Sequence, residues 1–297
     1  MPDDTPAAAL RDRLPPPGSL GLGCGRIGDA ALHETEVERL LLGALDLGVS
    51  LIDTARSYGL SEERIGRALS GRRHSFILST KVGYDIPPHP DWTYPCVAGG
   101  IDAALTRLRT DVIDIVHLHS CPREVLARGE VVRALEDAAR AGKLRMVGYA
   151  GDGDAAAHAV ECGRFAALET SVSFLDQAAL AATVPAAAAR GVLVIAKRPL
   201  ADAPWRWATP PSAPDSAEYH RRFRTARDLD AARAGLDWAE LAIRFAAFAP
   251  GVSTALLGTS RLAHLARAAA SVSRGPLPAD QSAALRAAFP PAWPGII

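Results

Sequence analysis

The sequence has few of the features that mark secreted, membrane-spanning or nucleic-acid-binding proteins. Its 4 cysteines are far apart and form no CxxC pair, which argues against the disulfide framework of small secreted domains. The 33 basic and 33 acidic residues cancel to a net charge of +0, so a general attraction to nucleic acid or anionic membranes is not expected. No apolar run approaches the ~18 residues of a membrane span, and the start lacks the charged-then-apolar order of a signal peptide. We therefore expect a cytoplasmic protein, a monomer or small homo-oligomer, that acts on a small molecule.

Hydrophobic residues make up 48% of the chain and charged residues 22%, a balance that favours a packed core over disorder. Residues 1–18 are rich in proline and predict an irregular, loosely held arm. The remaining residues, 19–297, predict a single domain, since one α/β barrel uses about this length.

One pattern repeats after the arm. A helical stripe over 34–47 is stopped by Gly48 and is followed by a short apolar strand over 49–53. Further helices are expected over 61–70, 98–110, 130–141, 153–162, 176–190, 236–249 and 260–272, and strands over 19–23, 76–81, 112–119, 144–149, 166–172, 192–196 and 252–257. Eight such units favour a closed (β/α)₈ TIM barrel, with a doubly wound sheet as the alternative. Two long connections, 82–97 and 197–217, are expected on the face where the strands end.

Gly23, Gly25 and Gly28 satisfy the G-x-G-x-x-G pattern of dinucleotide-binding Rossmann folds. The context argues against that fold, because the expected helix begins several residues after Gly28 and a proline-rich segment precedes the strand. We interpret the glycines as positions that permit tight turns at the mouth of the first barrel strand.

Ionisable residues lie at the ends of three neighbouring strands. These strand-end residues are Asp53, Lys81 and His119, and Tyr58 follows Asp53 on a short loop. In a barrel they would converge on one site. A nearby ammonium favours the phenolate form of a tyrosine, so Lys81 is expected to lower the pKa of Tyr58, while a neutral His119 orients a substrate oxygen. This set suits proton transfer to a carbonyl oxygen.

The segments around these residues carry a family resemblance. They read IDTARSYGLSEERIGRAL (52–69), ILSTKVG (77–83), DIVHLHS (114–120) and AGKLRMVGY (141–149). The chain resembles the aldo-keto reductases from about residue 19 to 272. The resemblance implies a (β/α)₈ barrel, NADPH as cofactor with NADH possible, and a catalytic tetrad of Asp53, Tyr58, Lys81 and His119. It implies hydride transfer to an aldehyde or ketone, or from the corresponding alcohol or sugar, with Tyr58 as proton donor.

The expected nicotinamide site departs from the family pattern. Ala150 and Gly151 stand where a Ser-Asn pair is usual, followed by Asp152, and Glu169 replaces the usual glutamine. Glu169 can accept a hydrogen bond from a carboxamide but cannot donate one. A buried carboxylate there would also favour the oxidised, cationic nicotinamide, and we expect a cofactor potential shifted toward dehydrogenation.

Two further segments resemble the family's cofactor-binding motifs. The first holds Lys197, Arg198, Pro199 and Leu200, and Arg198 could pair with the pyrophosphate. The second holds Gly258, Thr259, Ser260, Arg261 and His264, whose donors lie at a helix start and could meet the adenosine phosphate.

The two long connections are expected to bind the substrate. Trp92 and Tyr94 lie on the first, and Trp205 and Trp207 on the second, so an apolar or ring-shaped carbonyl compound is expected. The basic stretch HRRFRTAR (220–227) is interpreted as a solvated helix face.

Three other functions stay open from the residues alone. His117 and His119 form an H-x-H pattern near Asp53, which is typical of metal-dependent barrel hydrolases, although Lys81 would repel the ion. A regulatory barrel that binds NADPH without turnover is a second alternative. A Schiff-base aldolase that uses Lys81 is a third.

Overall fold

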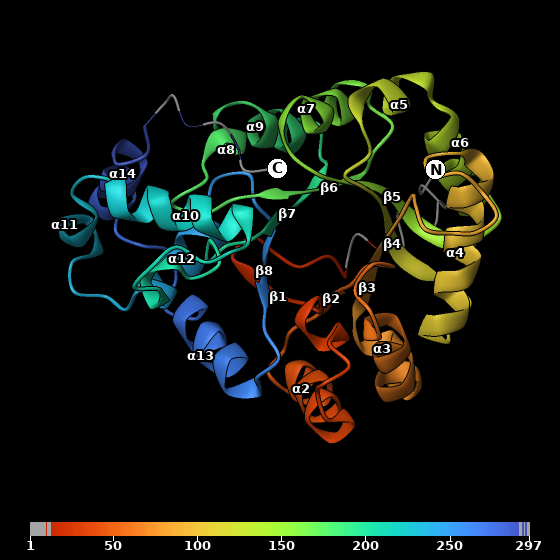
Figure 1. The fold of residues 1–297 in the computed structure, drawn as a ribbon, viewed down its shortest axis with the longest axis horizontal. Coiled ribbons are helices and arrows are strands. Elements are labelled where there is room, and N and C mark those ends of the chain that lie inside the picture. The colour runs from red at the N-terminus through yellow and green to blue at the C-terminus, as the bar shows by residue number, and fades with distance from the viewer. Residues whose placement is uncertain (1–9, 11–12, 291–292, 294, 296–297) are drawn as a thin grey trace.

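A computed structural model describes residues 10, 13–290, 293 and 295. Eight parallel strands form a closed barrel in chain order, β1 to β8, with β1 pairing β8 (Figure 1). The strands are β1 (Ser19–Gly23), β2 (Leu51–Asp53), β3 (Ile77–Val82), β4 (Ile113–His119), β5 (Leu144–Ala150), β6 (Ala167–Ser171), β7 (Leu193–Lys197) and β8 (Thr254–Gly258). The expected (β/α)₈ barrel is confirmed, and the doubly wound sheet is wrong.

Helices surround the barrel (Figure 1), and those that pack on the strands do so through an apolar stripe. They are α2 (Glu34–Asp46), α3 (Ser61–Leu69), α4 (Tyr94–Leu108), α5 (Arg123–Arg128), α6 (Glu130–Arg140), α7 (Gly153–Glu161), α8 (Ala178–Ala181), α9 (Thr183–Ala189), α10 (Pro214–Thr225), α11 (Leu229–Arg233), α12 (Trp238–Ala247), α13 (Leu262–Val272) and α14 (Ala279–Ala287). Among the described residues, no helix is long and apolar enough to cross a membrane.

Helix α4 begins four residues earlier than the sequence pattern indicated. Thr93 caps it by accepting a hydrogen bond from the Cys96 amide, and Pro95 occupies its first turn, where no amide hydrogen is needed. The first long connection therefore ends at Thr93, and Tyr94 belongs to the helix.

The helix expected over 176–190 is divided into α8 and α9. Ala182 breaks it with φ −145° and ψ −52°. Pro185 explains the break, because it has no amide hydrogen to donate to the residue four positions earlier.

A second apolar core lies beside the barrel, under α10, α11, α12 and α14, which gather on the left of Figure 1. The α10 stretch expected to be a solvated face contributes to it. Arg222 is buried, pairs with Glu218 and donates to the carbonyl of Leu175. That expectation is therefore wrong for Arg222 and for its buried neighbour His220.

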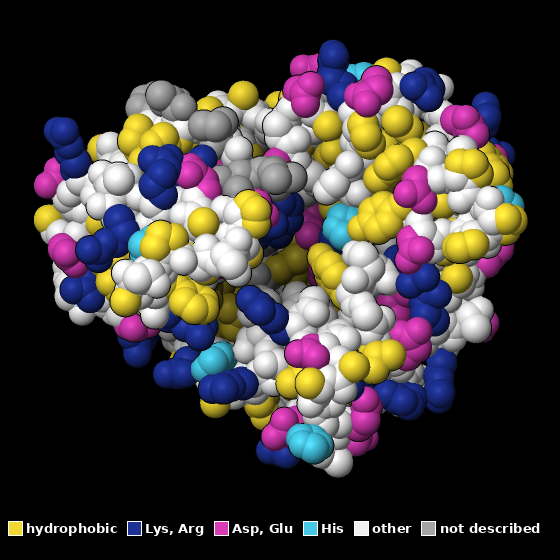
Figure 2. Space-filling view, in the orientation of Figure 1, with side chains coloured by type: hydrophobic (Ala, Val, Ile, Leu, Met, Phe, Trp, Pro, Cys, Tyr) yellow, Lys and Arg dark blue, Asp and Glu magenta, His cyan; other side chains and the backbone are white. Residues whose placement is uncertain are grey.

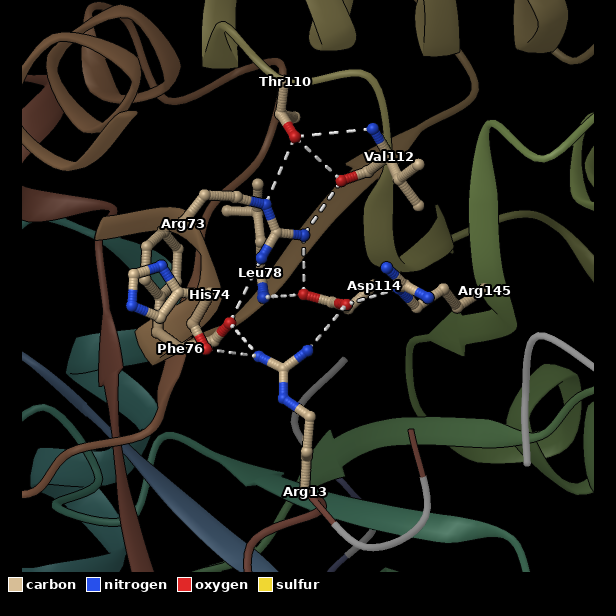
Figure 3. Close-up of polar contacts among 9 residues, drawn as sticks. All are labelled: Arg13, Arg73, His74, Phe76, Leu78, Thr110, Val112, Asp114 and Arg145. Carbon is tan, nitrogen blue, oxygen red and sulfur yellow. Dashed lines mark hydrogen bonds and ion pairs between the residues drawn. The ribbon is translucent and has the colours of Figure 1, made fainter. Parts of the chain in front are cut away.

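The base of the barrel is closed by the arm and by an ion cluster. Leu10 is fully buried among apolar residues at the strand starts. The buried carboxylate of Asp114 on β4 lies between three arginines, Arg13 (4.0 Å), Arg73 (2.6 Å) and Arg145 (3.0 Å) (Figure 3). The described part of the arm is thus held on the barrel at Leu10 and Arg13 rather than loosely.

Candidate active site

A cavity of about 1410 Å³ opens where the barrel strands end. A hollow with Lys and Arg side chains on its rim lies near the middle of the face drawn in Figure 2, over the barrel of Figure 1. Strand-end residues of the barrel line the cavity, namely Asp53, His119, Ala150, Glu169, Lys197 and Gly258. The site therefore lies at the edge that the strand-end pattern predicted.

Lys81 stands under this cavity as a fully buried ammonium. Its Nζ lies 2.5 Å from Oδ2 of Asp53 and 3.0 Å from Oε2 of Glu169, and it donates to the carbonyl of Thr54 at 3.1 Å. Burial alone would lower the pKa of Lys81, but the carboxylates of Asp53 and Glu169 outweigh burial and raise it above the usual value. Lys81 is therefore a permanent cation.

Tyr58 lies above Lys81, whose Nζ is 5.5 Å from the centre of the phenol ring. Lys81 lowers the pKa of the Tyr58 hydroxyl, as the sequence analysis expected. Burial and the carboxylates Glu169 and Asp53 together outweigh that effect and raise the pKa to about 12. The expected net lowering is wrong, and Tyr58 keeps its proton at neutral pH.

Gly28 determines where the Tyr58 loop lies. A Cβ on Gly28 would stand 1.8 Å from the carbonyl oxygen of Tyr58, and the Leu60 amide donates to the carbonyl of Gly28 at 3.1 Å. The nearby Gly25 lies against the ring, with 3.7 Å from its built Cβ to the phenol carbons. These glycines permit close backbone packing, which agrees with the interpretation that they are not a Rossmann fingerprint.

His119 forms the opposite wall, with its ring centre 5.9 Å from that of Tyr58 in a T-shaped arrangement. Burial and then Lys81 lower the pKa of His119 to about 3, so the ring is neutral, as expected. The structure adds Tyr84, which the sequence analysis did not find. Its hydroxyl lies 2.7 Å from Nδ1 of His119 and 3.1 Å from Oγ of Ser57.

Glu169 brings a second carboxylate to the cluster from β6. Burial would raise its pKa, but Lys81, His117 and Lys197 together outweigh burial and keep the pKa below the usual value. Burial and Glu169 instead raise the pKa of Asp53. Although Oε2 of Glu169 is 3.0 Å from Lys81, it receives no hydrogen bond of acceptable angle among the described residues. Glu169 therefore presents a buried acceptor at the cavity wall.

Basic side chains line the far part of the cavity. They come from the loop after β1, the loop after β7 and the start of α13, and are Arg26, Arg206, Arg261, His264 and Arg267. The pKa of His264 is lowered by burial first and then by the positive charges of Arg267, Arg261 and Arg206. These cations therefore lie in one region. Such a wall suits an anionic ligand with several phosphates.

Comparison with protein families decides the family of this barrel. The profile described as the aldo/keto reductase family matches residues 19–289. The chain belongs to the aldo-keto reductase family.

Individual relatives agree with this assignment. The chain is 34% identical over 139 residues to the 6-dehydroglucose reductase of Novosphingobium aromaticivorans, covering 42% of this chain and 45% of the relative. It is 37% identical over 139 residues to the methylglyoxal reductase YeaE of Escherichia coli, covering 44% of each. The matches thus span less than half the length of these curated relatives.

Solved structures share the fold over nearly the whole chain. An aldo-keto reductase from Bacillus halodurans in its holo form has a TM-score of 0.74 at 24% identity, covering 92% of this chain and 93% of that one. An aldo-keto reductase from Klebsiella pneumoniae in complex with NADPH has a TM-score of 0.74 at 24% identity, covering 93% and 92%. At these identities the likeness concerns the fold.

Two basic residues expected to bind cofactor are engaged within this aldo-keto reductase. Lys197 lies 2.5 Å from Oδ2 of Asp152, whose carboxylate also accepts from Ser171. Lys197 lines the cavity, whereas Asp152 lies beneath it. Arg198 also lines the cavity and pairs with Asp215 at 2.7 Å. Both cations are therefore held by carboxylates of the chain itself.

The remaining residues expected to contact the cofactor lie along the cavity wall, namely Pro199, Leu200, Gly258, Thr259, Ser260, Arg261 and His264. Gly258 is exposed at the end of β8, and Thr259 Oγ1 accepts from the Arg261 amide at 3.1 Å just before α13. The segment therefore offers backbone donors at a helix start.

The four aromatic residues expected to bind substrate occupy different surroundings. Trp207 lines the cavity and is 44% exposed. Trp205 also lines it, but its ring stacks at 6.3 Å on Trp238 in the second core. Trp92 packs on Tyr84 with ring centres 5.6 Å apart and, like Tyr84, is not among the residues that line the cavity. Trp207 is thus the aromatic side chain most open to a ligand.

Tyr94 points away from the site. Its hydroxyl donates to Asp137 on α6 at 2.9 Å, and its amide donates to Glu130 at 2.9 Å. Tyr94 is not among the residues that line the cavity, so we no longer assign it to the substrate.

Three residues that could hold a metal ion lie around Lys81. Asp53, His117 and Glu169 have ligand atoms within 4.8 Å of one another. The ammonium of Lys81 lies at 2.5 and 3.0 Å from the two carboxylates, so the protein's own cation takes that position. The arrangement does not favour the metal-dependent hydrolase.

Proposed function

We propose that this aldo-keto reductase is an NADP-dependent alcohol dehydrogenase or carbonyl reductase that reduces an aldehyde or ketone with NADPH. The observation that supports it best is the juxtaposition of a protonated Tyr58, a buried Lys81 and a neutral His119 beneath one cavity. The presence of NADP or NADPH in solved relatives supports the same cofactor. Non-catalytic binding of NADPH is disfavoured because the whole tetrad is assembled.

The cavity residues fit a nicotinamide dinucleotide. Glu169 lines the cavity, and its carboxylate can accept a hydrogen bond from the carboxamide amine. The wall formed by Arg206, Arg261 and Arg267 can hold the phosphates, and a 2′-phosphate there would favour NADPH over NADH. When bound, the reduced dinucleotide supplies the hydride.

Tyr58 supplies the proton. With its pKa raised to about 12, its hydroxyl is protonated at neutral pH and can donate to a carbonyl oxygen that gains negative charge. Lys81 stabilises the phenolate that results, because its ammonium lies 5.5 Å from the ring centre. Asp53 holds Lys81, and the neutral His119 can donate a hydrogen bond that orients the same oxygen.

We propose that the substrate is a small carbonyl compound. The relatives named 6-dehydroglucose reductase and methylglyoxal reductase indicate keto sugars and small oxoaldehydes as the first classes to test. Trp207, at the open wall of the cavity, supports a substrate with an apolar or ring-shaped part. We place the activity in the cytoplasm, where NADPH is supplied.

The test is consumption of NADPH with a panel of aldehydes, oxoaldehydes and keto sugars. Tyr58→Phe should lower turnover by roughly 10²- to 10⁴-fold while leaving NADPH binding intact. Tyr149→Phe is a matched control, since it removes a buried hydroxyl that donates to the carbonyl of Cys121 on the outer side of the barrel. Near-native turnover in Tyr58→Phe would remove Tyr58 from proton transfer, and NADPH binding without turnover on any substrate would favour the regulatory function.

A further inference from the structure

The ammonium of Lys81 is shared by two buried carboxylates. Asp53 reaches it from β2 at 2.5 Å and Glu169 from β6 at 3.0 Å, and all three side chains are at most 3% exposed. When both carboxylates are ionised, two negative charges face one positive charge in a region from which water is largely excluded, and the raised pKa of Asp53 makes this full charge depend on pH. Within the low-dielectric interior such an excess acts over several ångströms.

Neighbouring titratable groups do not cancel this excess. On β4, burial lowers the pKa of His117 to about 4 and that of His119 to about 3, so both are neutral. On the loop after β1, burial raises the pKa of the Cys24 thiol, and on the loop after β2, Tyr58 is protonated at neutral pH. The remaining charged neighbour of Glu169 is Lys197 on β7, which lies 2.5 Å from the carboxylate of Asp152.

The excess charge is directed toward the cavity. Glu169 lines the cavity, whereas Lys81 lies behind it and is not among the lining residues. Oε2 of Glu169 is buried against the Lys81 ammonium at 3.0 Å, so the part of this side chain that lines the cavity lies on the other side from Lys81. A ligand placed next to Tyr58 would therefore meet a carboxylate rather than an ammonium on this wall.

We propose that Glu169 is a specificity-determining residue that makes this site select the oxidised, cationic form of the nicotinamide dinucleotide over the reduced, neutral form. The proposal rests on the proposed function, because hydride transfer to an oxygen-protonated carbonyl requires the nicotinamide to lie near Tyr58. The two forms differ by one positive charge on the ring, and a carboxylate interacts differently with each.

The consequence concerns the direction of reaction. A couple that binds more tightly in its oxidised form has a lower reduction potential when bound, by thermodynamic linkage, so the bound reduced form is a stronger hydride donor. This corrects the expectation of a shift toward dehydrogenation. Glu169 also raises the pKa of Tyr58, which makes its hydroxyl a weaker acid, so the expected gain for carbonyl reduction comes from cofactor binding.

The test is the ratio of the dissociation constants of NADPH and NADP⁺, measured by calorimetry without substrate. Glu169→Gln removes the charge and keeps the shape. The wild-type preference for NADP⁺ should fall by about tenfold, the size expected for one charge several ångströms away at an effective dielectric of about 20, partly offset by Lys81. Glu169→Asp, which keeps the charge, should retain most of the preference. The control is Glu161→Gln, the same change at an exposed position at the end of α7.

An unchanged ratio in Glu169→Gln, with both forms still bound, would overturn the inference but leave the proposed function standing. Failure of the wild-type protein to bind either form would overturn the proposed function itself. If Glu169→Gln does not fold, the wild-type ratio is measured from about pH 6 to about pH 8.5. Because burial and Glu169 raise the pKa of Asp53, the cluster gains negative charge as the pH rises. The preference for NADP⁺ should rise with pH, and a flat ratio would overturn the inference.

Discussion

The hydroxyl of Tyr84 lies 2.7 Å from Nδ1 of His119, and the two rings stack with centres 5.6 Å apart. Whichever atom carries the shared proton, the contact fixes the orientation of the imidazole and thus the direction in which its other nitrogen points. Tyr84 follows Lys81 by three residues and is held in turn by Trp92. It is a positioning residue for the substrate side of the site.

Replacing Tyr84 by phenylalanine should therefore weaken the orientation of His119. We expect kcat/KM for the carbonyl substrate to fall by about three- to tenfold, the range of one net hydrogen bond, with NADPH affinity unchanged. Ser57→Ala is the control, because it removes the other partner of the Tyr84 hydroxyl and spares His119. Equal losses in substrate turnover and in NADPH affinity would contradict the assignment.

Replacing Gly28 by alanine should displace the Tyr58 loop, since the new Cβ would stand 1.8 Å from the carbonyl oxygen of Tyr58. We expect a loss of about 1–3 kcal/mol in the free energy of unfolding, which is typical of overpacking. Relative to the wild type, turnover should fall by a larger fraction than the free energy of unfolding. Denaturant unfolding and NADPH consumption measure the two. In the control, Gly71→Ala, the new Cβ would have no other atom within 4 Å, so stability and turnover should both stay unchanged. If Gly28→Ala also changes neither quantity, the loop can move freely and the prediction is contradicted.

Replacing Asp114 by alanine should leave Arg13, Arg73 and Arg145 without their shared carboxylate (Figure 3). Removing one member of a buried ion cluster costs about 3–5 kcal/mol of stability, and we expect a loss in this range on denaturant unfolding. Asp111→Ala, at an exposed position of the same segment, is the control. A loss no larger than that of the control would mean that the arginines do not need Asp114.

Stability should depend on pH through His117, which is fully buried and bonded through Nε2 to Ser79 at 3.1 Å. Its pKa falls from 6.5 to about 4 on folding, so the unfolded chain binds the proton more readily. The contribution of His117 is present above pH 6.5 and is lost as pH falls through about 4, by up to about 3 kcal/mol.

The comparison with His117→Asn isolates this effect. Asp53 acts in the opposite sense, because its raised pKa gives stability that is lost as pH rises through about 7. Asp53 is present in both proteins. The wild type should therefore lose its advantage over the variant as the solution is acidified, and a difference in unfolding free energy that is constant with pH would contradict the prediction.

The sequence was sufficient to predict the barrel and the convergence of Asp53, Lys81 and His119 on one site. Asp53, Lys81 and His119 end consecutive apolar strands, and parallel strands of a barrel bring their ends together. Tyr84 could not be found in this way, because its contact with His119 depends on the path of the loop over 83–93. That path includes Trp92 at φ 58° packed against Gly83, which no local pattern predicts.

The acidity of Tyr58 shows a second limit. Tyr58 and Lys81 were expected in the same site from their places at or after the ends of neighbouring strands, so the lowering of the Tyr58 pKa by Lys81 could be predicted. Glu169 lies on β6, and its approach to Lys81 becomes visible only when the barrel is closed. Tyr94 was misassigned for a related reason, since Thr93 and Pro95 begin α4 early and turn the phenol toward α6.

The burial of Leu10 shows that the folded unit includes residues ahead of the family match. The family match begins at residue 19, yet Leu10 fills the space between the first residues of the strands, and Arg13 reaches the backbone of His74 and Phe76. A shortened chain that starts at the family boundary would lose an apolar plug and an arginine together. Truncation for expression or crystallisation should accordingly keep the stretch ahead of β1, or solvent will enter the barrel from its underside.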